Sequence, residues 1–157
     1  MNKKELLIIL SLISTSAFSQ LGLFNEGGDG LIFHIGQDDA VQAESDITNL
    51  TGATIEFENG GTPALALKGN FLNSTSGTYT LGTETIEFNG TALQSADFGG
   101  DDIYGLLTNN ASNISIDRHV TITGSLDYST GHLISTTSAY PTIETTGVTT
   151  GADDDSH

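Results

Sequence analysis

Apolar residues alternate with polar or small residues along most of the chain after residue 50, which is the period of a β-strand with one buried face. The alternating positions are Ile55 and Phe57, Leu65 and Leu67, Tyr79 and Leu81, Ile86 and Phe88, Ile114 and Ile116, and Val120 and Ile122, continued by Leu126 and Tyr128. No window outside the N-terminal segment shows the i, i+3, i+4, i+7 spacing of an amphipathic helix. The pattern predicts an all-β protein with little helix.

Clusters of Gly, Asn, Asp and Ser separate these predicted strands and are typical of tight turns. Such clusters occupy residues 58–61, 73–77, 89–90, 99–102 and 109–110. Each predicted strand carries only two or three inward apolar residues, too few to bury a face alone, so like residues must stack on neighbouring coils to complete a core. Asn at the corners suits this arrangement, because it tolerates left-handed backbone conformations and its amide can bond along a ladder.

A short motif occurs twice in the middle of the chain. The segment TIEFENG at residues 54–60 returns as TIEFNG at residues 85–90, an offset of 31 residues. Fixed periods of roughly 20 to 50 residues indicate solenoids, propellers or arrays. We therefore expect a β-solenoid in which this repeat marks one or more coils. The alternative is an antiparallel β-sandwich in which two hairpins share the motif by chance.

Longer stretches of the chain resemble a known family. The segments LALKGNFLN (65–73) and TIEFNGTALQ (85–94), followed by VTITGSL (120–126) and STGHL (129–133), resemble large secreted β-solenoid proteins of gliding Bacteroidota-type bacteria. The resemblance covers most of residues 45–157. It implies a right-handed parallel β-helix with adhesin-like roles, exported by a Sec signal and often sorted to the cell surface by a separate C-terminal domain. The family offers no catalytic residues to transfer.

The N-terminal residues have the features of an export signal. Lys3 and Lys4 supply a positive start, residues 6–13 an apolar stretch, and residues 17–19 a small-x-small pattern that permits cleavage before Gln20. The apolar run is shorter than the roughly 20 residues that span a bilayer. We therefore expect a signal peptide at residues 1–19 and a secreted or cell-surface protein.

The remaining chain divides into three predicted parts. Residues 20–45 form an N-terminal cap, residues 46–150 the solenoid repeats, and residues 151–157 an acidic tail or a truncation point within a longer chain. An uncapped solenoid end exposes backbone donors and acceptors to edge pairing, so a cap is physically required. Its predicted apolar residues are Leu21, Leu23, Phe24, Leu31, Ile32 and Phe33.

The charge balance excludes several partners. The chain has four Lys and Arg residues against 20 Asp and Glu, a net charge of −16, and removing Lys3, Lys4 and Glu5 with the signal leaves −17. Nucleic acids and anionic membrane surfaces need a cationic patch, so neither is an expected partner. The chain has no cysteine, so no disulfide stabilises the fold despite its predicted export.

Paired acidic residues on glycine-rich turns suggest calcium, which takes six to eight oxygen ligands. The best local cluster is Asp97, Asp101 and Asp102, beside Gly99 and Gly100; further acidic residues are at 38–39 and 153–155. Neither an EF-hand loop nor the calcium-binding nonapeptide repeat is present. The alternative is that these residues form solvated surface turns.

Nothing in the chain indicates a catalytic centre, and we expect no cofactor. The G-x-S-x-G motif is absent, and the four histidines (34, 119, 132 and 157) lack the spacing of a helical metal pair. Some parallel β-helices cleave polysaccharides, and such an enzyme would draw its carboxylate pair from Glu56, Glu58, Glu84 and Glu87. In period-two strands, however, these residues fall on the outward face, and Lys68 and Arg118 are the sole cations after the signal.

The sequence therefore predicts an exported, non-catalytic structural or adhesive module that displays Thr, Asn and Asp for weak multivalent contacts with glycans or other surface components. The alternatives are a carbohydrate-active enzyme or glycan-binding fragment, a calcium-binding module, and an ice-binding protein. Ice binding would need Thr-x-Thr triplets at the same place on consecutive coils, but those at residues 78–80, 83–85 and 121–123 are irregularly spaced. Five Asn-x-Ser/Thr sequons, at Asn49, Asn73, Asn89, Asn110 and Asn113, look like results of composition.

Overall fold

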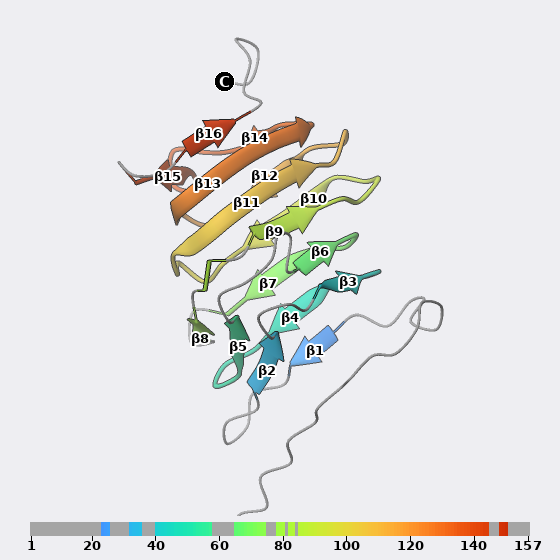
Figure 1. Cartoon of the computed structure of the whole chain (residues 1–157), viewed down its shortest axis with the longest axis vertical. Helices are drawn as coiled ribbons and strands as arrows, with labels where there is room; N and C mark the ends of the chain where they lie inside the picture. Colours follow the sequence, from blue (N-terminus) through green and yellow to red (C-terminus); the bar gives the residue numbers. More distant parts are fainter. Residues whose placement is uncertain are drawn as a thin grey trace, which may run out of the picture.

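The computed structural model is a parallel β-helix (Figure 1). It describes residues 23–25, 32–35, 40–57, 65–74, 78–80, 82–83, 85–144 and 148–150, which form 16 β-strands and no helix. Every strand pairing in these residues is parallel, so the predicted β-solenoid is confirmed and the antiparallel sandwich is wrong. The same residues provide no helix with the length and apolarity needed to cross a membrane.

Three sheets wrap around the helix axis, each taking one strand from successive turns. Sheet A consists of β1 (Leu23–Asn25), β4 (Ile47–Asn49), β7 (Phe71–Asn73), β10 (Gln94–Asp97), β12 (Ile114–Ile116) and β14 (Leu133–Ile134). Sheet B consists of β2 (Ile32–Ile35), β5 (Thr54–Phe57) and β8 (Thr78–Thr80). Sheet C consists of β3 (Val41–Ala43), β6 (Leu65–Leu67), β9 (Thr85–Phe88), β11 (Ile103–Asn109), β13 (Val120–Thr130), β15 (Pro141–Ile143) and β16 (Val148–Thr150).

The cross-section changes part-way along the molecule. Up to β9 each turn contributes a strand to all three sheets, but the next two turns contribute only β10 with β11 and β12 with β13. The turn length falls accordingly, from the 24 residues that separate the paired Ile47 and Phe71 to the 20 that separate Gln94 and Ile114. The long strand β13 pairs with β15 through its first residues and with β16 further along.

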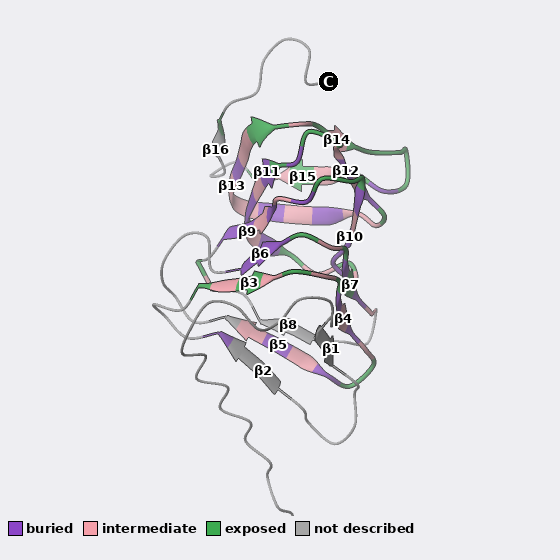
Figure 2. Ribbon diagram, turned by 90° about the vertical axis from the view of Figure 1, so that its right-hand side faces the viewer, coloured by how far each residue is buried: buried purple, intermediate pink, exposed green. Residues whose placement is uncertain are grey.

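Buried apolar side chains from all three sheets form the core inside the β-helix, and Figure 2 shows the buried positions along the strands in purple. The largest fully buried side chains include Phe88, Leu65, Leu67, Ile86 and Ile114, which the alternating pattern assigned to the inward face, and Phe71, which that pattern did not include. The stacking follows the register, because Leu67 pairs with Phe88 and Phe88 with Thr108. The core is therefore built between turns, as the shortness of the strands required.

Buried asparagines form a ladder at the end of sheet A. Asn49 Nδ2 donates to Asn73 Oδ1 at 2.7 Å, and Asn73 Nδ2 donates to the carbonyl oxygen of Phe98 at 3.2 Å. Both asparagines are fully buried, so these bonds satisfy polar groups that would otherwise be costly inside the core. This confirms the expected ladder of corner asparagines.

A second polar network lies where sheet C returns to sheet A. Gln94 Oε1 accepts the backbone N–H of Gly90 at 2.9 Å, and Asn110 Nδ2 donates to Gln94 Oε1 at 2.9 Å and to the Ala92 carbonyl at 2.7 Å. Gln94 and Asn110 are both buried. Gln94 Nε2 also donates to the Leu67 carbonyl oxygen at 3.1 Å, so the network ties three successive turns together at this corner.

The 31-residue repeat does not mark the coil. Its first copy is β5 in sheet B, and its second copy is β9 in sheet C, so the two TIEF segments do not stack on each other. Instead β9 pairs with β6 and β11 at offsets near 20 residues. The prediction that this repeat measures whole coils is wrong, because the turn is shorter and varies in length.

Several predicted segments fall outside the described residues. These are the signal peptide at 1–19, the acidic residues at 38–39 and the tail at 151–157. Within the predicted cap, β1, β2 and β3 pair with β4, β5 and β6, while the six apolar side chains assigned to the cap are not described. The division into cap and repeats stays a prediction.

Candidate functional site

Charged and aromatic side chains gather where the chain passes from sheet A to sheet C in three successive turns. The connections are residues 98–102, 117–119 and 135–140, which we call the A–C corner. Because neighbouring parallel strands lie about 4.8 Å apart, side chains on adjacent connections come within contact distance. The corner includes Arg118, one of the two cations that follow the predicted signal.

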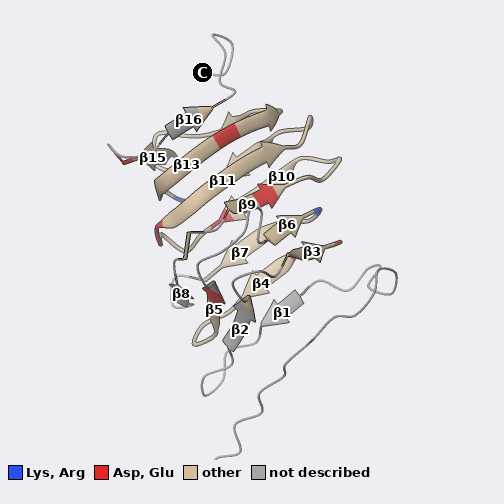
Figure 3. Ribbon diagram, in the orientation of Figure 1, with Lys and Arg blue, Asp and Glu red and all other residues tan. Residues whose placement is uncertain are grey.

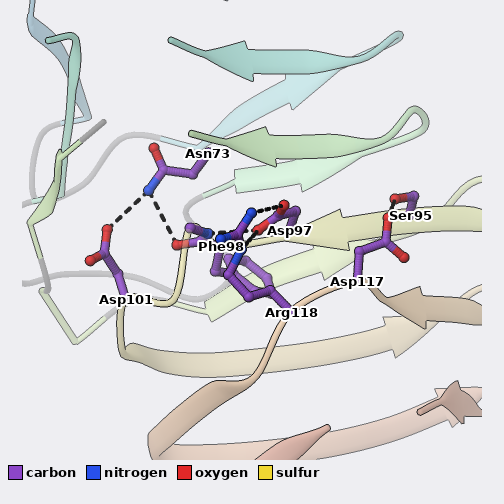
Figure 4. Close-up of polar contacts among 8 residues, drawn as sticks. Asn73, Ser95, Asp97, Phe98, Asp101, Asp117 and Arg118 are labelled. Carbon is purple, nitrogen blue, oxygen red and sulfur yellow. Dashed lines mark hydrogen bonds and ion pairs between the residues drawn. The ribbon is translucent and has the colours of Figure 1, made fainter. Parts of the chain in front are cut away.

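An ion pair clamps two turns together at this corner (Figure 4). Arg118 Nε donates to Asp97 Oδ1 at 3.0 Å, and its Nη2 donates to Asp97 Oδ2 at 3.2 Å. The backbone N–H of Gly99 also donates to Asp97 Oδ1, at 2.8 Å. The Asp97 side chain is only 12% exposed, whereas that of Arg118 is 42% exposed, so the carboxylate fixes a guanidinium that faces solvent.

The backbone after Asp97 permits this geometry. Gly99 and Gly100 both have positive φ angles, of 76° and 92°, which glycine adopts without strain. A Cβ on Gly99 would lie 2.9 Å from both Asn73 Nδ2 and the Ser74 carbonyl oxygen, and one on Gly100 would contact the Arg118 side chain. Gly99 and Gly100 thus allow the chain to turn directly after the buried Phe98, and they leave space for the Arg118 side chain.

The structure separates the residues predicted to bind calcium. Asp97 binds Arg118, Asp101 Oδ2 accepts a hydrogen bond from Asn73 Nδ2 at 3.0 Å, and Asp102 is exposed. Among the described residues no group of three or more His, Cys, Asp or Glu side chains is placed to hold a metal. The guanidinium already supplies positive charge to both Asp97 oxygens, so Asp97 does not fit a calcium site.

An aromatic pair continues the corner toward the C-terminal turns. The rings of His119 and Tyr140 lie 4.7 Å apart between centroids, with an angle of 76° between their planes. His119 Nε2 lies 3.0 Å from Thr142 Oγ1, within hydrogen-bond distance. The backbone N–H of Val120 donates to the Tyr140 carbonyl, which holds the two turns in register. Tyr140 is nevertheless 43% exposed.

No family model, curated protein or solved structure matches the chain. The chemistry of the A–C corner therefore has to be argued from its own side chains.

In the part of the chain that the structure describes, two groups have a pKa displaced from its ordinary value. The hydrogen bond and the charge of Asp97 raise the pKa of Arg118, and burial raises the pKa of the Tyr128 phenol. Both changes move the pKa further from neutral pH. Neither group thereby becomes a proton donor or acceptor suited to catalysis near pH 7.

The two described carboxylates among those considered for a polysaccharide-cleaving site lie in different sheets. Glu56 is on β5 in sheet B and Glu87 on β9 in sheet C, while Glu58 and Glu84 lie outside the described residues. The threonine triplets are similarly divided, since 78–80 is β8 in sheet B and 121–123 lies in β13 of sheet C. The structure therefore aligns neither Glu56 with Glu87 nor the triplet at 78–80 with the one at 121–123 along one column.

Buried positions give the sequon asparagines a structural explanation. Asn49, Asn73 and Asn110 are fully buried and bonded within the two polar networks. Asn113 has a φ of 74° and accepts the backbone N–H of His132 at 3.0 Å. Four of the five sequons thus coincide with corner asparagines that the fold requires.

The sequence indicated neither the Asp97–Arg118 clamp nor the His119–Tyr140 pair. Both pairs are separated by 21 residues, which is the turn length in this part of the chain. A search for opposite charges or aromatic residues at that spacing would have found them. The apparent 31-residue period concealed this signal.

Replacing Arg118 with alanine is expected to lower the free energy of unfolding by about 1–2 kcal/mol, because it leaves the Asp97 carboxylate largely buried without its cation. Urea denaturation followed by circular dichroism measures the change. Lys68→Ala is the matched control, since the Lys68–Glu44 pair joins side chains that are 49% and 38% exposed and should contribute less than about 1 kcal/mol. Equal losses in the two variants would contradict the clamp.

Proposed function

We propose that the chain is an exported, non-catalytic structural or adhesive β-solenoid that presents polar side chains for weak multivalent contacts at a cell surface. One observation carries the adhesive part of this proposal. A row of polar side chains runs along the edge of sheet C where its strands end, one from each of five successive turns. This polar row consists of Glu44, Lys68, Asn89, Asn109 and Thr130.

The polar row follows the strand register, so its members repeat at about 4.8 Å. Lys68 Nζ lies 2.7 Å from Glu44 Oε2, and Thr130 Oγ1 donates to Asn109 Oδ1 at 3.3 Å. Asn109 Nδ2 also donates to Glu87 Oε1, at 2.8 Å. These contacts orient polar groups on a rigid surface, which lowers the entropy lost when a partner binds.

The charged residues are spread over this face rather than gathered in one patch (Figure 3). Lys68 is paired with Glu44, and the chain carries a large negative charge overall. Contacts with uncharged surface components therefore suit the face better than contacts with polyanions. The features of residues 1–19 and the resemblance to secreted solenoids support export.

Export is tested with the full chain expressed in a bacterium that has two membranes. Protein recovered outside the cytoplasm should begin at Gln20 when its N-terminus is sequenced. Retention of an intact Met1 in the cytoplasm would contradict export.

Adhesion is tested with beads coated with the exported protein and placed on films of neutral polysaccharide. Coated beads should be retained about 100-fold more strongly than the free protein, because linked weak contacts act together. Beads coated with the same chain after heat unfolding keep its charge and composition and serve as the control. Equal retention of folded and unfolded coatings would contradict the proposal, and release of reducing sugar ends would favour the enzyme alternative.

A further inference from the structure

The A–C corner combines an exposed aromatic ring with polar groups held in fixed positions. Tyr140 contacts His119, and His119 is within hydrogen-bond distance of Thr142 on the neighbouring strand β15. Arg118 directly precedes His119 in the same connection, and Asp97 fixes its side chain. These side chains come from two consecutive turns, with Arg118 bonded toward the preceding turn at Asp97 and His119 in contact with the following turn at Tyr140 and Thr142.

Arg118 retains hydrogen-bonding capacity toward solvent. A guanidinium carries five N–H donors, and Asp97 accepts from its Nε and Nη2 atoms. The remaining donors belong to a side chain that is 42% exposed. Because two hydrogen bonds to Asp97 limit its motion, Arg118 loses little further entropy when it donates to a ligand.

The aromatic and polar groups are complementary to a sugar. Tyrosine offers a large apolar surface with a polar end and little conformational entropy to lose, which makes it an effective contact residue. Sugar hydroxyls accept from Arg118 and exchange hydrogen bonds with Thr142, while the C–H face of a pyranose packs against an exposed ring such as Tyr140. The net charge of −16 opposes the approach of polyanions, and Asp97 neutralises the arginine.

We propose that Arg118, His119, Tyr140 and Thr142 form a contact site for neutral polysaccharides, which we call the corner site. The proposal deepens the adhesive function and rests on it. Asp97 acts as a positioning residue that fixes Arg118. The site lies on an open surface, so each contact is weak and the polymer binds through repeated contacts along the molecule.

Affinity electrophoresis of the full chain in native gels tests the corner site. The probes are two neutral polymers, mixed-linkage β-glucan and galactomannan, and one anionic polymer, polygalacturonate. The wild-type protein should be retarded by at least one neutral polymer and not by polygalacturonate. Tyr140→Ala should weaken this retardation by at least about tenfold, an effect of the size seen for interface anchor residues.

Three variants separate binding from folding. Tyr140→Phe keeps the ring and should retain most of the retardation, and Arg118→Lys keeps the charge but loses the two-pronged bond and should weaken it. Leu93→Ala removes another exposed apolar side chain, 57% exposed, and should change nothing. The thermal unfolding midpoint of Tyr140→Ala should fall by only a few degrees, because the variant loses the ring contact with His119 but no core packing.

The results that overturn the corner site are specific. They are no retardation by either neutral polymer, equal retardation of wild type and Tyr140→Ala, or equal retardation by polygalacturonate. If coated beads adhere while Tyr140→Ala has no effect, the corner site is wrong and the adhesive function stands. If beads coated with wild-type protein do not adhere, the adhesive function fails as well.

Discussion

Replacing Phe98 with alanine is expected to lower the free energy of unfolding by about 3–5 kcal/mol, the range for a large aromatic side chain removed from a core. Phe98 is fully buried, and its ring lies 5.2 Å from that of Phe71 and 6.5 Å from that of Phe88 between centroids. It enters the core where sheet B has ended, so no strand of that sheet fills the space. Chemical denaturation with urea measures the loss.

Two further variants make this result interpretable. Leu93→Ala, at an exposed position just before the same strand β10, should change the free energy of unfolding by less than about 0.5 kcal/mol. Phe98→Leu keeps much of the volume and should cost less than the alanine variant even if the latter does not fold. If the Phe98→Ala protein were as stable as Leu93→Ala, Phe98 would not stabilise the core of the turns that lack a strand in sheet B.

The second large effect is expected for Gly131→Ala, at about 2–5 kcal/mol of lost stability. Gly131 has a φ of 78°, and a Cβ there would lie 1.9 Å from the carbonyl oxygen of Asn110. The left-handed conformation alone costs an alanine about 1–2 kcal/mol. The clash adds about 1–3 kcal/mol, because Asn110 is held by its bonds to Ala92 and Gln94 and the carbonyl cannot move freely.

Gly52→Ala separates these two contributions. Gly52 has nearly the same φ, 81°, but no atom lies within 4 Å of the position its Cβ would take. This variant should lose only the conformational cost of about 1–2 kcal/mol. If urea and thermal unfolding gave the same loss of stability for both variants, a clash between a Cβ at position 131 and the Asn110 carbonyl would not contribute to the loss.

The sheets were predictable because their signal is local. The period-two alternation at residues such as Ile86, Phe88, Ile114 and Ile116 follows from one face being buried, and all four side chains are buried. The shortness of the strands then required stacking of successive turns, which the parallel pairings confirm. The corner asparagines were predictable for the same reason, since a buried ladder needs a residue that both donates and accepts.

The coil length was not predictable from one repeated motif. Residues 54–57 and 85–88 share the sequence TIEF and both form short strands, yet one lies in sheet B and the other in sheet C. The alternation specifies which side chains point inward but not which sheet a strand joins. That choice depends on connections whose lengths differ from turn to turn.

The candidate site was recognised only in part for a related reason. Asp97, Asp101 and Asp102 stood out because they are close in sequence, but the partners that define their roles are Arg118 and Asn73, which are distant. Tyr140 belongs to no local motif, and the sequence offered His119 only as a candidate metal ligand without a partner at helical spacing. Side chains that meet only across turns become visible once the pitch is known.

The pitch of this fold also decides what kind of object the chain builds. A turn uses between 19 residues, as from Ile114 to Leu133, and 25, as from Phe71 to Ala96, yet it advances the axis by only about 4.8 Å. An α-helix of 20 residues would extend about 30 Å. Each added turn therefore lengthens the molecule very little. It instead adds one more outward side chain to every column on the sheets, so a longer chain of this kind would gain mainly exposed surface.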